Sequence, residues 1–242
     1  MTFSIQQKVR LGDTTPRGRL RLDSMARYLQ DVAAEDAAHA HLPDGRGWIL
    51  RRMTYEIGRL PTIYEDLEIK TAPSGVGGRW AERTTTLVGL DGLNDARTAL
   101  RQGVLATAIA IWVYVRLDTG APVALPPEFF VAYGDAIRER KVSARLIHPA
   151  PPPDAPRVGF PLRSTDFDVF GHVNNAVYWV PVEDELARSD TGRLTAASIE
   201  FGGGVLPGEV CELVTVRTPT EVALWFLVGG DVRASIRADL AP

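Results

Sequence analysis

The sequence is poor in residues that form crosslinks or hold metal ions. Cys211 is the only cysteine among the 242 residues, so no disulfide can form within the chain. The first residues do not show the charged and then apolar pattern of a signal peptide. Neither a metal-ligand spacing nor a glycine-rich phosphate loop occurs. We therefore expect a cytoplasmic protein with no metal and no cofactor.

Strong net charge and long apolar runs are also missing. The formal net charge of -3 provides no basic field that would attract nucleic acid or an anionic membrane. The longest nearly apolar run, Leu105 to Val115, is much shorter than the ~20 residues that a membrane span needs. We predict a buried strand there, no membrane span, and a small-molecule or protein substrate.

What the sequence does contain is one structural plan that occurs twice. A helix is predicted over 23–38, because Leu22, Met25, Leu29 and Val32 form one apolar stripe. Strand patterns follow it, at 48–57, 64–71, 80–89 and 105–117. The second half repeats the order, with a helix from Gly171 to about Leu186 and strands at 196–201, 210–217, 222–228 and 232–238.

The two halves also share short stretches of sequence. Tyr55-Glu56-Ile57-Gly58 corresponds to Ile199-Glu200-Phe201-Gly202, and Gly18 before the first helix corresponds to Gly171 before the second. A polar stretch that we expect to be helical as far as 142, and then a proline-rich run at 149–153, separate the halves. We predict an α+β protein with a duplicated domain: 1–126, a linker over 127–157, and 158–242.

The segment from Asp168 to Tyr178, DVFGHVNNAVY, closely resembles the signature of hotdog thioesterases. The first half resembles the amino-terminal module of acyl-acyl carrier protein (acyl-ACP) thioesterases at Gly18-Arg19-Leu20, Trp48-Ile49-Leu50, Trp112-Val113-Tyr114-Val115 and Leu125-Pro126-Pro127-Glu128. The resemblance implies a tandem (double) hotdog, in which a curved antiparallel sheet wraps a long helix in each domain. It implies that the second hotdog carries catalysis and that the first forms much of the acyl-chain pocket.

The implied activity is hydrolysis of fatty acyl-ACP to a free fatty acid and ACP in fatty acid biosynthesis. Two positions depart from the family pattern. Phe170 stands where plant members have an asparagine, and the run Gly202-Gly203-Gly204 stands where they have a catalytic glutamate. The polar network that the resemblance implies is thereby reduced to Asp168 and His172, which is closer to the simpler acyl-CoA thioesterases of this fold.

These two residues suit thioester hydrolysis. Asp168 can attack the carbonyl carbon directly or deprotonate a water molecule. His172 can orient the carbonyl, share the role of base, or protonate the departing thiolate. The amides near Gly171 to Val173, at the predicted start of the second helix, are candidates for an oxyanion hole. Without such a motif around it, an aspartate before a helix is more often a cap.

Other residues near the motif have less specific interpretations. Asn174 and Asn175 can bind substrate, or they can serve only as hydrogen-bonding groups at the helix start. Cys211 lies in an alternating strand pattern and is interpreted as structural. Pro181 falls within the predicted second helix, so we expect a break or bend near Val177.

Three functions remain open: an acyl-ACP hydrolase, a hotdog acyl-CoA thioesterase, and a non-catalytic acyl-binding protein. An acidic carrier protein would need basic residues near the pocket, for which the candidates are Arg17, Arg19, Arg21, Arg51 and Arg52. The partner is therefore ACP or acyl-CoA, with a homodimer as one possible assembly. When Gly18 is laid on Gly171, Thr15 matches Asp168 and Arg19 matches His172, so we predict that the first domain has no active site of its own.

Overall fold

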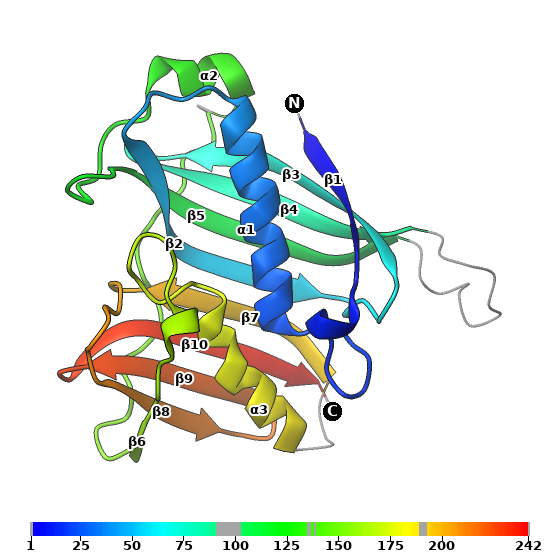
Figure 1. Cartoon of the computed structure of the whole chain (residues 1–242), viewed down its shortest axis with the longest axis vertical. Coiled ribbons are helices and arrows are strands. Elements are labelled where there is room, and N and C mark those ends of the chain that lie inside the picture. Colours follow the sequence, from blue (N-terminus) through cyan, green and yellow to red (C-terminus); the bar gives the residue numbers. More distant parts are fainter. Residues whose placement is uncertain (1, 91–102, 135–136, 138, 189–192, 242) are drawn as a thin grey trace. The chain divides into compact units, whose positions relative to one another are not determined.

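The computed structural model describes residues 2–90, 103–134, 137, 139–188 and 193–241. Within them the chain forms two compact units, Met1–Ala144 and Arg145–Pro242. Figure 1 shows each unit as an antiparallel sheet with a helix lying against it. Each unit is described by itself.

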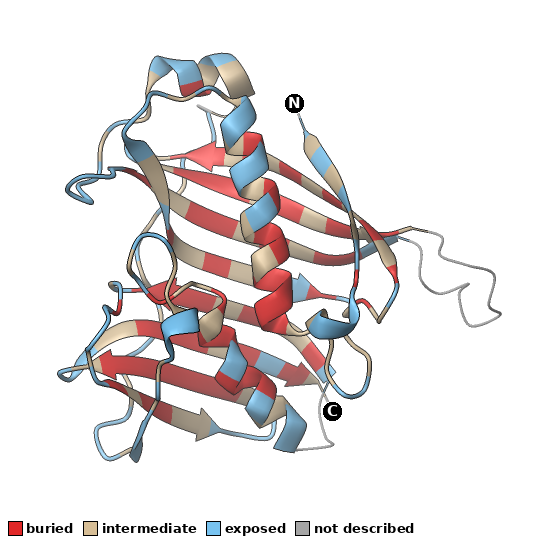
Figure 2. Cartoon of the chain, viewed as in Figure 1, coloured by how far each residue is buried: buried red, intermediate tan, exposed pale blue. Residues whose placement is uncertain are grey.

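The first unit is a five-stranded sheet packed against a long helix. Its sheet order is β1-β3-β4-β5-β2. The elements are β1 (Phe3–Lys8), α1 (Leu22–His39), β2 (Arg46–Ile57), β3 (Asp66–Val76), β4 (Trp80–Gly89), β5 (Gly103–Arg116) and α2 (Pro127–Tyr133). The predicted apolar stripe of α1 is fully buried, and Figure 2 shows that the helix faces the sheet with its buried side. The predicted strand over 105–117 is β5, an interior strand between β4 and β2.

The second unit repeats this topology with shorter elements. Its sheet order, β6-β8-β9-β10-β7, matches the first when the strands of each unit are counted in chain order. The strands are β6 (Arg157–Gly159), β7 (Arg193–Phe201), β8 (Cys211–Arg217), β9 (Glu221–Val228) and β10 (Asp231–Ala241). The helix on this sheet is α3 (Val180–Arg188). The edge strands β1 and β6 were not predicted, because β1 is short and polar and β6 has only three residues.

The second helix begins later than the sequence predicted. A helix was expected from Gly171, but a 3-10 turn at Val177–Trp179 leads into α3 at Val180. Gly171 adopts φ +73°, which a right-handed helix does not allow. Pro181 lies in the first turn of α3, where its missing N–H costs nothing. The expected break near Val177 is therefore a change from 3-10 to α geometry at the helix start.

The segment predicted as a linker is divided between the two units. Its beginning is α2, whose Phe129 is buried against Val76 and Ala81 of the first unit. Its later part follows the sheet of the second unit. The N–H groups of Ile147 and His148 donate to the Glu200 carboxylate at 2.8–2.9 Å. The polar stretch was expected to be helical to 142, but α2 ends at 133; residues 135–136 and 138 lie outside the described residues.

Candidate active site

The Asp168 to Val173 segment forms a tight hairpin loop ahead of the helical turn. The Asp168 N–H donates to the His172 carbonyl at 2.9 Å, and the Gly171 N–H donates to the Asp168 carbonyl at 3.0 Å. Phe167 and Val173 close the loop as a β-bridge. The positive φ of Gly171 allows this reversal. The loop therefore carries Asp168 and His172 on one short, hydrogen-bonded scaffold.

The Asp168 carboxylate has one engaged oxygen and one available oxygen. Its Oδ1 accepts the Phe170 N–H at 2.9 Å, an Asx-type turn that fixes the side chain. Its Oδ2 accepts no hydrogen bond from the residues that the structure describes. An aspartate held by one oxygen, with the other open, is suited to act as nucleophile or base.

His172 is exposed, and its ring lies against the backbone of Gly204. A Cβ at position 204 would lie 2.4 Å from Cδ2 of the His172 ring. Gly204 thus provides the space that the imidazole occupies. A larger residue there would displace the ring.

The expected oxyanion donors need correction. Because no helix starts at Gly171, its N–H is used inside the loop, and the Val173 N–H donates to the Val205 carbonyl at 3.0 Å. The Asn174 side chain accepts the Ala176 N–H at 2.9 Å, which forms an Asx-type turn just before the 3-10 turn. Asn175 has no hydrogen-bond partner among the described residues, and it remains the candidate donor of the four.

Two charged residues that the sequence analysis missed, Glu209 and Arg233, lie near Tyr178, whose buried ring packs edge-on against Phe201 and Phe226. Burial raises the pKa of Tyr178; after burial come an ionised Cys211, which also raises this pKa, Arg233, which lowers it, and Glu209 and Asp168, which raise it. A surface depression of about 600 Å³ lies beside this cluster. It is lined by residues 159–164, Phe167 and 207–211.

Cys211 lines this depression, but its thiol is a poor nucleophile. Burial raises the pKa of Cys211 to about 11, with the charges of Glu209 and Glu212 adding to the effect. The thiol is therefore protonated at neutral pH, which agrees with the structural role expected for it.

The first unit contains the same loop with different side chains. The Thr15 N–H donates to the Arg19 carbonyl and the Gly18 N–H to the Thr15 carbonyl, both at 2.8 Å. Gly18 has φ +78°, close to the value of Gly171. The alignment made from sequence is therefore confirmed by the backbone: Thr15 occupies the position of Asp168, and Arg19 that of His172.

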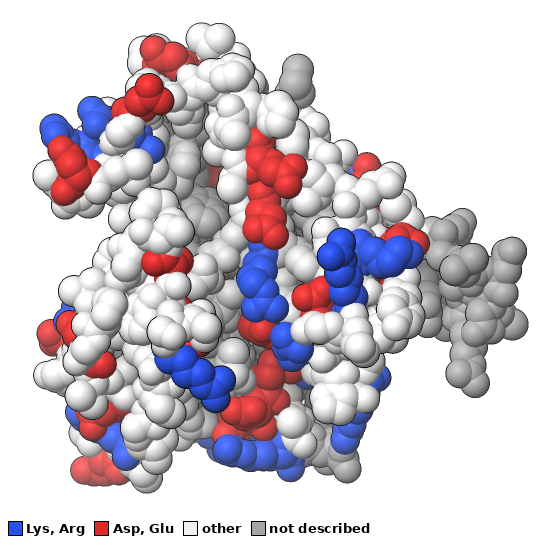
Figure 3. Space-filling model, in the orientation of Figure 1, with Lys and Arg blue, Asp and Glu red and all other residues white. Residues whose placement is uncertain are grey.

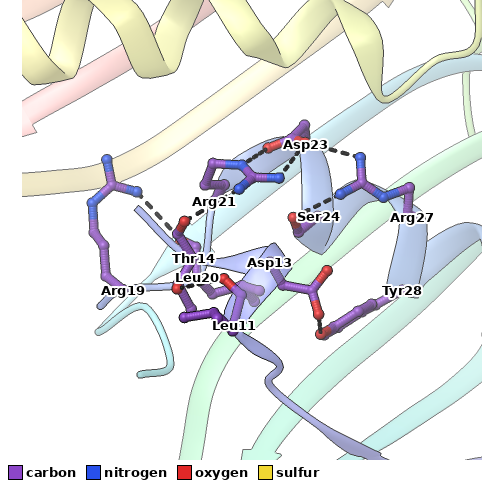
Figure 4. A network of polar contacts seen from close by, with 10 residues as sticks. All are labelled: Leu11, Asp13, Thr14, Arg19, Leu20, Arg21, Asp23, Ser24, Arg27 and Tyr28. Atoms are coloured by element: carbon purple, nitrogen blue, oxygen red, sulfur yellow. Dashed lines mark hydrogen bonds and ion pairs between the residues drawn. The ribbon is translucent and has the colours of Figure 1, made fainter. Parts of the chain in front are cut away.

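Arginines dominate the surroundings of this first loop. Figure 4 shows the buried Asp23 between Arg21 and Arg27, each paired with it at 2.8 Å. Arg21 also donates to the Thr14 carbonyl at 3.2 Å. Burial acts to raise the pKa of Asp23, but the hydrogen bonds from the two arginines outweigh it and lower the pKa. This network fixes the start of α1 and contains no counterpart of Asp168.

Comparison with known proteins identifies the family. The model of the acyl-ACP thioesterase N-terminal domain matches residues 1–133, and that of the C-terminal domain matches residues 152–225. The chain belongs to the acyl-ACP thioesterase family. It is accordingly a thioester hydrolase with a double hotdog fold.

Relatives of this thioesterase include proteins of Mycobacterium tuberculosis and of Cuphea viscosissima. An uncharacterised protein of Mycobacterium tuberculosis is 30% identical over 227 residues, covering 92% of this chain and 86% of the relative. A chloroplastic acyl-[acyl-carrier-protein] hydrolase of Cuphea viscosissima is 24% identical, over 80% of this chain and 47% of that protein.

Two solved structures share the fold of this thioesterase. The acyl-ACP thioesterase of Bacteroides thetaiotaomicron has a TM-score of 0.79 at 19% identity, covering 99% of this chain and 98% of that one. The 12:0-ACP thioesterase of Umbellularia californica also has a TM-score of 0.79, at 17% identity, covering 100% of this chain and 97% of that one.

None of the helices in the described residues is long and apolar enough to cross a membrane. No group of three or more His, Cys, Asp or Glu among the described side chains is placed to hold a metal ion.

Proposed function

We propose that this enzyme hydrolyses fatty acyl-ACP to free fatty acid and ACP in fatty acid biosynthesis, with Asp168 and His172 as its catalytic residues. The observation that carries the proposal is the loop of the second unit, which holds the Asp168 carboxylate by one oxygen and leaves Oδ2 open. The same loop in the first unit has Thr15 and Arg19 at these positions. The first unit therefore lacks both a base and a carboxylate nucleophile there.

The reaction consumes one water and breaks the bond between the acyl carbon and sulfur. In one route Asp168 Oδ2 attacks the carbonyl carbon, the thiolate leaves, and water then hydrolyses the mixed anhydride. In the other route Asp168 takes a proton from a water molecule while that water attacks the carbonyl carbon, and the thiolate then leaves. In both routes His172 protonates the departing thiolate, and the Asn175 amide stabilises the oxyanion.

ACP is the proposed carrier because of the charge around the first loop. Residues 10–28 contain five arginines and two aspartates, whereas the corresponding residues 163–181 contain one arginine and two aspartates. Figure 3 shows basic side chains around the start of α1 and acidic ones farther along it. An acidic carrier protein would be attracted to the basic end. Acyl-CoA remains the alternative substrate, because its phosphates are also anionic.

A non-catalytic acyl-binding role fits the loop less well. Buried or half-buried polar groups with a purely structural role are usually hydrogen-bonded. The half-buried Asp168 has no hydrogen-bond partner for Oδ2 among the described residues, although its loop is closed by backbone hydrogen bonds of Asp168 with His172 and Gly171.

The test is release of free thiol from acyl-ACP, acyl-CoA and acyl-pantetheine over a series of chain lengths, measured with a chromogenic thiol reagent. We expect turnover of all three, with the highest kcat/KM on acyl-ACP. Equal kcat/KM on acyl-ACP and acyl-CoA would favour the acyl-CoA thioesterase. No thiol release from any substrate would favour the non-catalytic alternative.

A further inference from the structure

Each unit contains a glutamate that closes the turn before its third strand in chain order. In the first unit, Glu65 accepts the Thr62 N–H at 2.8 Å, and its own N–H donates to the Thr62 carbonyl. In the second unit, Glu209 makes the same two bonds with Leu206, also at 2.8 Å through its side chain. The two glutamates are therefore structural counterparts.

The arginines that face these glutamates come from different strands. In the first unit, Arg59 at the end of β2 binds both oxygens of Glu65, at 2.6 and 2.9 Å. The second unit has Gly203 at the position of Arg59. The Gly203 N–H donates to the Arg233 carbonyl on β10, as the Arg59 N–H donates to the Leu105 carbonyl on β5. The arginine that faces the glutamate therefore follows β2 in the first unit, whereas in the second unit it lies on β10, the strand that corresponds to β5.

The ion pair between arginine and glutamate is longer and more exposed in the second unit than in the first. The Glu65 side chain is 1% exposed, and its partner is within hydrogen-bond distance. Glu209 is 29% exposed, Arg233 is 31% exposed, and their closest approach is 3.9 Å, too long for a hydrogen bond. Arg233 Nε is buried with no partner, and its guanidinium makes no hydrogen bond to any described residue. A guanidinium has five N–H donors, so such a group is unusually unsatisfied.

The unsatisfied arginine lies in the region of the catalytic loop. Its Nη1 would be 3.3 Å from a Cβ on Gly203, and the neighbouring Gly204 contacts the His172 ring. Glu209 lines the same depression as Phe167, the residue that precedes Asp168. The Tyr178 hydroxyl feels the charges of both Arg233 and Asp168. A partly exposed cation thus lies near Tyr178 and beside the glycine run that contacts the His172 ring.

We propose that Arg233 is a further catalytic residue that binds the acyl oxygen, first as the thioester carbonyl gains negative charge and then as the carboxylate of the released acid. Arginine forms short, charge-assisted hydrogen bonds with such oxygens. Glu209, held by the Leu206 N–H, limits the movement of the guanidinium without occupying its donors. The role rests on the proposed hydrolysis, but carboxylate binding can be measured without turnover.

The first experiment measures binding of dodecanoate and of the neutral dodecanol by calorimetry. Arg233→Met should weaken dodecanoate binding about tenfold or more and leave dodecanol binding within about twofold, because only the carboxylate needs the cation. The matched control is Arg237→Met on the same strand, whose guanidinium is already paired with Glu221 at 2.6 Å. The control should bind both ligands as the wild type does.

The second experiment installs the arrangement of the first unit. The double variant Gly203→Arg with Arg233→Leu should fold with an unchanged or higher Tm, because the new arginine can pair with Glu209 as Arg59 pairs with Glu65. Its dodecanoate binding should fall as in Arg233→Met, and kcat for thioester hydrolysis should fall about 10²-fold.

The inference is overturned if Arg233→Met and the double variant keep wild-type carboxylate binding, or if the wild type shows no preference for the carboxylate over the alcohol. Arg233-dependent binding of dodecanoate without any thioester hydrolysis would support the site and contradict the proposed function. Thioester hydrolysis that is unaffected by Arg233→Met would support the proposed function and contradict the role of Arg233.

Discussion

The two units share a backbone and differ in which polar groups are satisfied. In the first unit Asp23 and Glu65 are buried, each bound by arginine, whereas the second unit leaves Asp168 Oδ2 and the Arg233 guanidinium without such partners. Closed ion pairs favour a stable scaffold, and open polar groups favour binding and chemistry at some cost in stability. With the proposed site in the second unit, the duplication would separate the two requirements within one chain.

The largest expected difference between the units is the effect of their arginine–glutamate pairs on stability. Arg59→Met leaves Glu65 buried without its cation, and we expect a loss of about 3 kcal/mol in the free energy of unfolding. Arg233→Met removes a loose, one-third exposed pair and should change the free energy of unfolding by less than about 1 kcal/mol. Urea unfolding of both variants provides the measurement. Equal losses would show that the two pairs are structurally equivalent.

Gly204 should matter for activity more than for folding. Gly204→Ala places a Cβ where the His172 ring lies, so the imidazole must move, and we expect kcat to fall by up to about 10²-fold. Gly78→Ala in the first unit is the control, because a Cβ there meets nothing within 4 Å. An unchanged kcat in Gly204→Ala would mean that His172 does not act from this position.

Acid should weaken the first unit through its paired carboxylates. Burial acts to raise the pKa of Glu65, but hydrogen bonds from Arg59 and Thr62 outweigh it, so the folded-state pKa of Glu65, like that of Asp23, is lowered. Their contribution is complete above the unfolded-state pKa values, near 4, and is lost as pH falls through the lower folded-state values. We expect about 1 kcal/mol of stability to be lost on going from pH 5 towards pH 3.

Urea midpoints across this pH range, for the wild type and for Arg59→Met, test this expectation. The variant should show the smaller loss of stability, because Glu65 has already lost its partner. A variant with the same pH dependence as the wild type would exclude Glu65 as a source of the effect.

The smallest expected effect concerns the carrier. Arg17→Glu with Arg19→Glu should raise KM for acyl-ACP several-fold, leave kcat on acyl-pantetheine unchanged, and be mimicked by added salt. Arg21, although basic, is left out because it holds Asp23. Arg157→Glu with Arg188→Glu makes the same charge change in the second unit and is the control. Equal effects on both substrates would assign the arginines to the pocket rather than to docking.

Much of the fold was predictable because the sequence repeats its pattern. The apolar stripe of α1 and the alternating strands are local signals, and each predicted strand is present in the structure. The predicted start of the second helix was wrong because hydrogen bonds within the loop hold Gly171 at a positive φ, which the local sequence pattern did not indicate. The edge strands β1 and β6 gave no apolar signal.

The candidate site was only partly predictable. Asp168 and His172 came from a local motif, but Glu209 and Arg233 come from a turn and a strand that meet only in the folded chain. A signal for Glu209 was present in the sequence repeat. Tyr55 and its counterpart Ile199 are 144 positions apart, and Glu65 and Glu209 have the same spacing. Nothing comparable marks Arg233, because its counterpart Leu105 is apolar.

The central claim is that the chemistry belongs to the loop of the second unit alone. The direct measurement is kcat for acyl-ACP hydrolysis by Asp168→Asn and, in parallel, by Thr15→Val at the corresponding position. Asp168→Asn should lose at least about 10²-fold with its fold intact, because the amide can neither attack nor accept a proton. Thr15→Val should stay within about twofold, because the buried Thr15 hydroxyl has no hydrogen-bond partner in the described part of the chain. Activity within about threefold of wild type in Asp168→Asn, or its loss in a folded Thr15→Val, would contradict the account.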